Sequence, residues 1–243
     1  MKTFFKIIKF IIIISLILLI SYFGYQEYLQ AKYPLHKIAV LLNQVEIPNN
    51  IHIKINSIND ISDYTREIYF KDNIIHEYSK NISLLENGPS YEYFNIITDT
   101  SIVEFCYDPK TILEYDKLDF DFTTEEEMML NYTSGAGDVF YQVENAANQG
   151  INKNSYRYLG KVTIDDKECL KFSIDNITSM YKKTIYYMDV ETNLIIKTEG
   201  YTSNDLETPL LITTYEYNFN SVTDLKEFDK NDYPDFTYTK QKR

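Results

Sequence analysis

The sequence predicts an α+β protein in which an N-terminal transmembrane helix precedes a strongly curved antiparallel β-sheet, a half-barrel, wrapped around a few helices. Three observations predict this fold class. Residues 7–25 form an apolar run. From residue 51 onward, apolar and polar residues alternate in short segments separated by turn residues. Residues 123–150 carry helix signals instead, and a sheet with one apolar face needs such helices as a cover.

The apolar run predicts a membrane anchor. At about 1.5 Å of helical rise per residue, residues 7–25 reach about 28 Å, close to the hydrocarbon thickness of a bilayer. Lys2, Lys6 and Lys9 lie at its amino side, and the first acidic residue is Glu27. Lys9 can extend its ammonium group back to the headgroups.

The flanking charges set the predicted topology. Positive residues before the run place residues 1–6 in the cytoplasm as a short stub, 7–26 in the membrane as a signal anchor and 27–243 outside the cell. A cleaved secretory signal is the alternative. Residues 19–25 offer no pair of small residues for cleavage, and the run is longer than a usual signal core, which favours retention.

Residues 27–45 are predicted as a juxtamembrane helix, with a break at Pro34 and regular helix from Leu35. Residues 46–243 are predicted as one extracytoplasmic domain that opens with an antiparallel meander. Asp72-Asn73 and Asp108-Pro109 supply two of its turns. The strands expected in it are 51–55, 65–71, 74–80, 91–98, 101–107 and 111–115.

Helices are predicted to interrupt the sheet once. Thr123 and Thr124 precede three glutamates, an arrangement typical of a helix start, and a second helix is predicted from Gly137 to Gly150. After Val222 the chain is polar and is predicted to be irregular. The strands expected between the helices and that tail are 156–164, 168–175, 182–189, 194–201 and 210–219, and Asp165-Asp166 is at a hairpin position between the first two.

The charge balance limits the classes of partner. The chain has 36 acidic and 24 basic residues, and three of the bases but no acid lie in residues 1–26, so residues 27–243 carry a formal charge of −15. Such a domain lacks the positive surface of a nucleic-acid binder, and anionic headgroups repel it. Nucleic acid is therefore excluded as a partner, and the N-terminal helix is the expected contact with the membrane.

Two cysteines, Cys106 and Cys169, lie in predicted strands. Outside the cell they could form a disulfide. They could equally be two buried thiols that behave as small apolar side chains, since a domain of this size needs no cross-link.

The carboxyl-terminal segments resemble a known superfamily. These segments read YLGKV at 158–162, CLKF at 169–172, TIYYMDVETNLIIK at 184–197 and YEYNFNSVTD at 215–224, followed by Phe228. They are similar to the closing hairpins of the LolA-like lipoprotein-carrier superfamily, which includes lipoprotein localisation factors, lipid-carrier lipoproteins and sensor partners of anti-sigma factors. The resemblance implies a half-barrel whose concave face holds acyl chains or a peptide segment. A retained anchor without a lipidated cysteine argues against a freely diffusing shuttle.

Nine side chains are the candidate ligand contacts. They are apolar or aromatic residues at alternate positions of the last four strands, and ordinary core packing explains the same pattern. The set is Leu170, Phe172, Ile185, Tyr187, Leu194, Ile196, Tyr215, Tyr217 and Phe219.

The remaining chemistry of the sequence indicates neither catalysis nor a metal. His36, His52 and His76 lack the spacing of metal ligands. The acidic residues between 116 and 127 lack the glycine and the alternation of a calcium loop. The glycines at 135 and 137 lack the lysine of a phosphate-binding loop, and no nucleophile motif is present. We therefore expect no cofactor and no enzymatic activity.

Two functions follow from the sequence. The first is a membrane-anchored, non-catalytic binding module that holds a lipid or a lipoprotein acyl chain in the half-barrel. The alternative is a sensing or interaction domain that binds another envelope protein through its acidic surface or a sheet edge.

Overall fold

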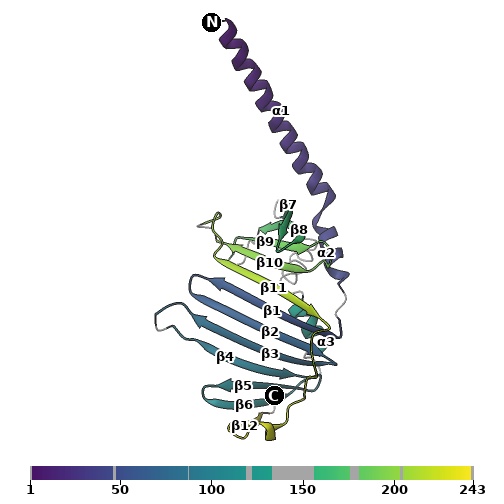
Figure 1. The fold of residues 1–243 in the computed structure, drawn as a ribbon, viewed down its shortest axis with the longest axis vertical. Coiled ribbons are helices and arrows are strands. Elements are labelled where there is room, and N and C mark those ends of the chain that lie inside the picture. The colour runs from purple at the N-terminus through teal and green to yellow at the C-terminus, as the bar shows by residue number, and fades with distance from the viewer. Residues whose placement is uncertain are drawn as a thin grey trace.

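The computed structural model describes residues 2–45, 48–86, 88–118, 122–132, 156–175, 181–202 and 205–241. The chain begins with helices α1 (Lys2–Lys32) and α2 (Leu35–Asn43). Their break falls at Pro34, as predicted, because a proline ring cannot continue a helix from the preceding turn. α1 projects away from the rest of the molecule (Figure 1). Judged on length and apolar character together, no helix in the described part of the chain qualifies as a membrane span.

The described residues of the domain form one open sheet of twelve strands (Figure 1). Its order is β12-β6-β5-β4-β3-β2-β1-β11-β10-β9-β8-β7, so two meanders meet where β1 pairs with β11. The sheet curves without closing, which confirms the predicted half-barrel architecture. The strands are β1 (Asn50–Asn59), β2 (Ser62–Lys71), β3 (Ile74–Ser83), β4 (Tyr91–Ile97), β5 (Ser101–Tyr107), β6 (Lys110–Asp116), β7 (Tyr156–Ile164), β8 (Lys167–Asp175), β9 (Lys183–Asp189), β10 (Ile195–Tyr201), β11 (Leu211–Phe219) and β12 (Thr237–Gln241).

Two-residue turns fix the register of two hairpins. Asp72 and Asn73 have φ of 51° and 62° between β2 and β3, and Asp165 and Asp166 have φ of 47° and 64° between β7 and β8. Asn and Asp tolerate this left-handed region, which a tight hairpin needs at both central positions. Both turns lie where the sequence predicts them.

The polar tail departs from the prediction. Residues 237–241, expected to be irregular, form β12, which pairs in parallel with β6 and makes the sheet mixed. The Tyr238 hydroxyl donates to Glu114 Oε2 at 2.6 Å and Lys240 Nζ to Glu114 Oε1 at 3.0 Å. The sequence did not predict β12 for two reasons. An exposed edge strand keeps polar residues, so its composition resembles that of a loop. Its partner strand is also more than a hundred residues away in the chain.

The midchain helix α3 (Thr124–Tyr132) starts as predicted. Thr123 and Glu126 form a capping box, with Glu126 Oε2 accepting from Thr123 N at 2.8 Å and Thr123 Oγ1 accepting from Glu126 N at 3.2 Å. Asp99 Oδ1 accepts from Thr124 N at 3.0 Å and ties the helix to the β4–β5 turn. The helix predicted from 137 to 150 lies outside the described residues.

The two faces of the sheet have different covers. On the face called here the helix face, Ile38 and Leu42 of α2 are 0% and 3% exposed, and Met128 of α3 is buried against β1 and β2. On the opposite strap face lie residues 222–236, called the strap, which pack Phe228, Tyr233 and Phe236 on β4, β5 and β6. The Asn50 amide holds the strap's first residue by bonding both the carbonyl and the N–H of Val222, at 2.9 and 2.8 Å.

Candidate functional site

The nine candidate ligand contacts are mostly core residues in the structure. Leu170 and Phe172 pack beneath α2. Leu194 joins the cluster formed by β1, β2 and α3. Phe219 is 43% exposed. The remaining five lie in a third cluster or at cluster borders and are Ile185, Tyr187, Ile196, Tyr215 and Tyr217.

Strand register explains why these residues do not form one inward set. β8 pairs with β9 so that Leu170 lies opposite Met188 and Phe172 opposite Tyr186. Tyr186 and Met188 therefore share the face of Leu170 and Phe172, whereas Tyr187 points to the other side of the sheet. The sequence shows which residues of one strand share a face. It does not show which residues of a neighbouring strand lie on that same face, because that depends on how the two strands pair. Ligand contact by the nine residues stays a prediction.

Tyr187 belongs to a buried polar network. Its hydroxyl donates to Glu199 Oε2 at 2.8 Å, the Tyr201 hydroxyl donates to the same oxygen at 2.9 Å, and Lys197 Nζ lies 2.8 Å from Glu199 Oε1. Burial opposes the charge of Glu199, but the hydrogen bonds from Lys197 and the two tyrosines outweigh it and lower its pKa. These groups satisfy one another and hold β9 to β10.

A polar hollow of about 460 Å³ opens on the helix face over β3 to β6. Register creates it, because Glu77 pairs with Asn95, Asn95 with Glu104 and Glu104 with Leu113 across four neighbouring strands. Side chains at paired positions project from the same face. The residues that line the hollow are Glu77, Tyr93, Asn95, Glu104, Phe105, Cys106 and Leu113.

Glu77 is the charged floor of this hollow. It is 6% exposed, and its Oε1 accepts from Arg66 Nε at 2.8 Å and from Ser79 Oγ at 3.3 Å. Burial opposes the charge of Arg66, but the Glu77 carboxylate outweighs it and raises the guanidinium pKa. On the other side of the hollow, Glu104 accepts a hydrogen bond from the Tyr115 hydroxyl.

Asn95 lies between the two carboxylates and has an unfilled acceptor. Its Oδ1 is buried and has no hydrogen-bond partner among the described residues. A buried carbonyl oxygen without a donor costs about 1–3 kcal/mol. A ligand that placed an N–H or O–H in the hollow would recover that cost.

The sequence carried a signal for this hollow. Ile75, Glu77 and Ser79 are alternate residues of β3 and lie on one face of it. Asn95 and Ile97 are alternate residues of β4 and likewise lie on one face. Polar residues therefore interrupt the apolar face of consecutive strands. The strands were predicted, but aligning these polar positions across them requires the register.

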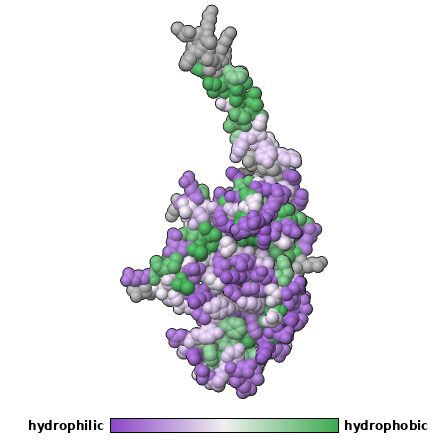
Figure 2. Space-filling view, in the orientation of Figure 1, coloured by the Kyte–Doolittle hydropathy of each residue, from purple (hydrophilic) through white to green (hydrophobic). Residues whose placement is uncertain are grey.

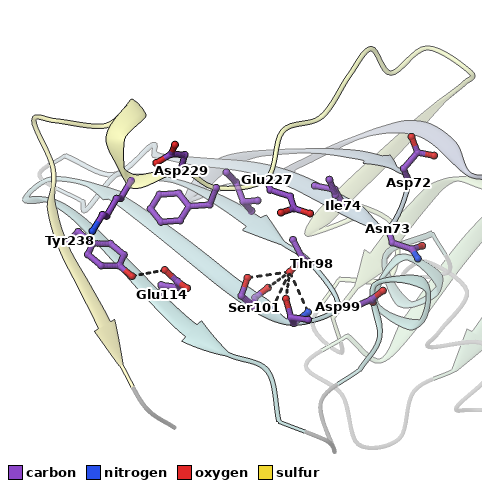
Figure 3. A pocket seen from close by; sticks show the side chains of 14 residues that line it. Asp72, Asn73, Ile74, Thr98, Asp99, Ser101, Glu114, Glu227, Asp229 and Tyr238 are labelled. Atoms are coloured by element: carbon purple, nitrogen blue, oxygen red, sulfur yellow. Dashed lines mark hydrogen bonds between the residues drawn. The ribbon is translucent and has the colours of Figure 1, made fainter.

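A second cavity, of about 620 Å³, lies between the strap and the sheet (Figure 3). Four of its five carboxylates, Asp72, Asp99, Glu114 and Asp229, accept hydrogen bonds from neighbouring residues. Glu114 binds Tyr238 and Lys240, and although burial opposes its charge these hydrogen bonds lower its pKa. Asp99 caps α3, and Asp229 Oδ1 accepts from Asn231 N at 2.9 Å at the helical turn of the strap. This cavity is therefore built from contacts that fix the strap, and the hollow is the better candidate site.

Neither cavity is a metal centre by composition. In the part of the chain with described coordinates, no three His, Cys, Asp or Glu side chains converge as a metal site requires. Cys106 and Cys169 are free thiols, the first exposed at the hollow and the second buried. The thiols are thus unpaired, as in the second alternative, but only Cys169 is buried as that alternative expected.

The geometry defines a class, a sheet half-barrel with helices on one face and a polar hollow beside them. No family model and no curated protein matches the chain. Among solved structures, an uncharacterized conserved protein from Thermus thermophilus matches with 10% identity and a TM-score of 0.49, over 84% of this chain and 98% of that one.

Two further matches come from named groups. The MucA/MucB complex of Pseudomonas aeruginosa matches with 12% identity and a TM-score of 0.40, over 78% of this chain and 57% of that one. A LolA superfamily protein from Nitrosomonas europaea matches with 11% identity and a TM-score of 0.26, over 79% and 94%. The superfamily resembled by the carboxyl-terminal segments is thus present among the structural neighbours. At these identities the likeness concerns the fold alone.

Proposed function

We propose that this protein is a non-catalytic binding module that holds a polypeptide segment of another envelope protein or lipoprotein in the helix-face hollow. The unfilled Oδ1 of Asn95 is the observation that carries the proposal. A polypeptide backbone presents N–H donors and C=O acceptors along its length. Asn95 would accept from such an N–H, and Tyr93 of the hollow supplies flat contact area with a polar end.

An acyl chain fits the hollow less well. Glu77, Asn95 and Glu104 line it, and covering charged or unpaired polar groups with hydrocarbon removes water without replacing its hydrogen bonds. A polypeptide is therefore a better ligand for the hollow than a lipid acyl chain.

A lipid remains the second candidate at a different position. Leu170 and Phe172 form an apolar surface that α2 covers with Ile38 and Leu42. α2 has only nine residues, so an acyl chain could replace its cover if the helix moved away from β8. This arrangement keeps the predicted ligand role of Leu170 and Phe172.

We further propose that residues 7–26 hold the domain at a membrane with residues 27–243 outside the cell. The support is the apolar run, its amino-terminal lysines and the exposure of its large side chains, from 36% at Ile8 to 65% at Phe10. The junction to the domain is fixed, because the Tyr156 hydroxyl of β7 donates to the Tyr33 carbonyl at 2.6 Å. An anchored α1 would therefore set the orientation of the sheet.

Photocrosslinking from Cys106 tests the binding proposal. The native thiol lies in the wall of the hollow, so a benzophenone maleimide attached to the full-length protein in membranes samples whatever occupies it. The control is Cys106→Ser combined with Thr163→Cys, which moves the probe to an exposed position on β7. We expect a polypeptide adduct from Cys106 only. A lipid adduct, or equal adducts from both positions, would refute it.

Alkaline carbonate extraction tests the anchor. The wild-type protein should remain with the membranes, and a variant with Leu16→Arg and Leu19→Arg should be released, because each arginine at the centre of a span costs about 2.5–3.5 kcal/mol. Release of the wild-type protein would show that residues 7–26 do not anchor it.

A further inference from the structure

We propose that one rim of the sheet is a docking surface for a second protein whose apolar contact area is ringed by lysine or arginine. The surface, called the rim patch, consists of five side chains that are 44–55% exposed. Figure 2 shows apolar side chains gathered at this edge of the domain, over the β1–β2 turn and the β3–β4 loop. The five residues are Ile58, Ile61, Ile82, Leu84 and Leu85.

Strand pairing places Ile58 and Ile82 on the same face of the sheet, with Asp63 between them. Ile58 lies opposite Asp63 on β2, and Asp63 lies opposite Ile82 on β3. The turn that carries Ile61 is fastened to the next loop, since the Ile61 carbonyl accepts from Leu84 N at 2.8 Å. The apolar side chains therefore occupy neighbouring positions on two linked turns. Single exposed apolar residues need no explanation, but a contiguous group of this kind marks an interaction surface.

The charges around the rim patch select the partner. Asp60, Asp63 and Glu86 lie among the five apolar residues, and neither residues 58–63 nor residues 82–86 contain a lysine or arginine. An acidic border disfavours an anionic membrane surface. It also disfavours a second copy of this chain, which would present the same acids. A protein with a basic border satisfies both the apolar area and the charge.

The rim patch is distinct from the hollow. The hollow takes Glu77 from β3 and its other residues from β4 to β6. The patch takes Ile58 and Ile82 from near the last residues of β1 and β3, and its other residues from the turns beyond them. Ile82 and Glu77 are five residues apart and so lie on opposite faces of β3. The two surfaces can therefore be tested separately, and this inference does not depend on what occupies the hollow.

A photoreactive residue tests the docking surface in cells. p-Benzoylphenylalanine would replace Leu84 in the full-length protein, with replacement of Leu159 as the matched control because Leu159 is 40% exposed on β7. Charge reversal by Asp60→Lys with Glu86→Lys would be combined with the Leu84 probe, and Glu191→Lys would serve as its control at a distant exposed turn.

The expected result is one dominant polypeptide adduct from position 84 and none from position 159. Its yield should fall about fivefold or more on double charge reversal, as two attractive rim contacts become repulsive, and should be unchanged by Glu191→Lys. A lipid adduct, an adduct to a second copy, an adduct indifferent to charge reversal, or no adduct above the Leu159 control would each overturn the proposal. A Cys106 adduct from the hollow would be unaffected in every case.

Discussion

Replacing Glu77 by leucine is expected to destabilise the protein by about 3 kcal/mol. The change leaves the Arg66 guanidinium facing an apolar side chain where its Nε donated to Glu77 at 2.8 Å. Removing one member of a buried ion pair costs about 3–5 kcal/mol. The lower end applies because the Arg66 side chain is 24% exposed and can turn partly toward water.

The double variant Arg66→Met with Glu77→Leu should be within about 1 kcal/mol of the wild type, because a buried pair replaced by apolar residues of similar volume is close to neutral. The double variant should therefore lose much less stability than the sum of the losses of the single variants Glu77→Leu and Arg66→Met. Binding should respond differently from stability. The double variant folds and keeps Asn95 and Glu104 but loses the buried charge of Glu77 in the hollow, so the yield of the polypeptide adduct at Cys106 should fall.

Urea unfolding of the full-length protein in mild detergent, followed by far-UV circular dichroism, measures these values. A Glu77→Leu variant destabilised by less than about 0.5 kcal/mol, the size typical of a change at an exposed site, would contradict the buried pair. So would a double variant whose loss equals that of the two single variants combined.

Three other changes test the core, the Glu199 network and the thiols. Ile38→Ala, at a fully buried position of α2, should cost about 2–5 kcal/mol in urea unfolding, and a smaller loss would mean that α2 is loosely held. Because the pKa of Glu199 is lowered in the fold, its stabilisation is complete above the unfolded-state pKa of about 4.3 and is lost as pH falls through the lower folded value. The wild-type urea midpoint should therefore fall more steeply below pH 4 than that of Glu199→Gln, and parallel curves would refute the network. Burial raises the pKa of the Cys169 thiol, so a thiol reagent should modify Cys106 in the folded protein and Cys169 only after unfolding; equal rates would contradict the fold.

Local features of the fold could be predicted from the sequence. Asp72-Asn73 and Asp165-Asp166 were recognisable as hairpin turns because the left-handed backbone they need favours these residue types. Thr123 and Thr124 before three glutamates indicated the start of α3. That signal is local, because the capping box that Thr123 forms with Glu126 joins residues three positions apart. Such signals lie within a few residues of the structure that they specify.

Long-range pairing could not be predicted in the same way. The contact of β12 with β6 depends on Tyr238 and Lys240 meeting Glu114, and no local pattern encodes it. For a related reason the nine candidate residues do not share one face, since Leu170 and Tyr187 lie on opposite faces of the sheet. The hollow around Asn95 likewise exists only once three strands are set in register.

The mass and identity of what crosslinks to Cys106 in native membranes test the central claim most directly. The predicted result is a peptide adduct that is present in the wild-type protein and reduced in the folded Arg66→Met with Glu77→Leu variant. An acyl-chain adduct, or a peptide adduct of undiminished yield in that variant, would contradict a polypeptide held by the polar hollow.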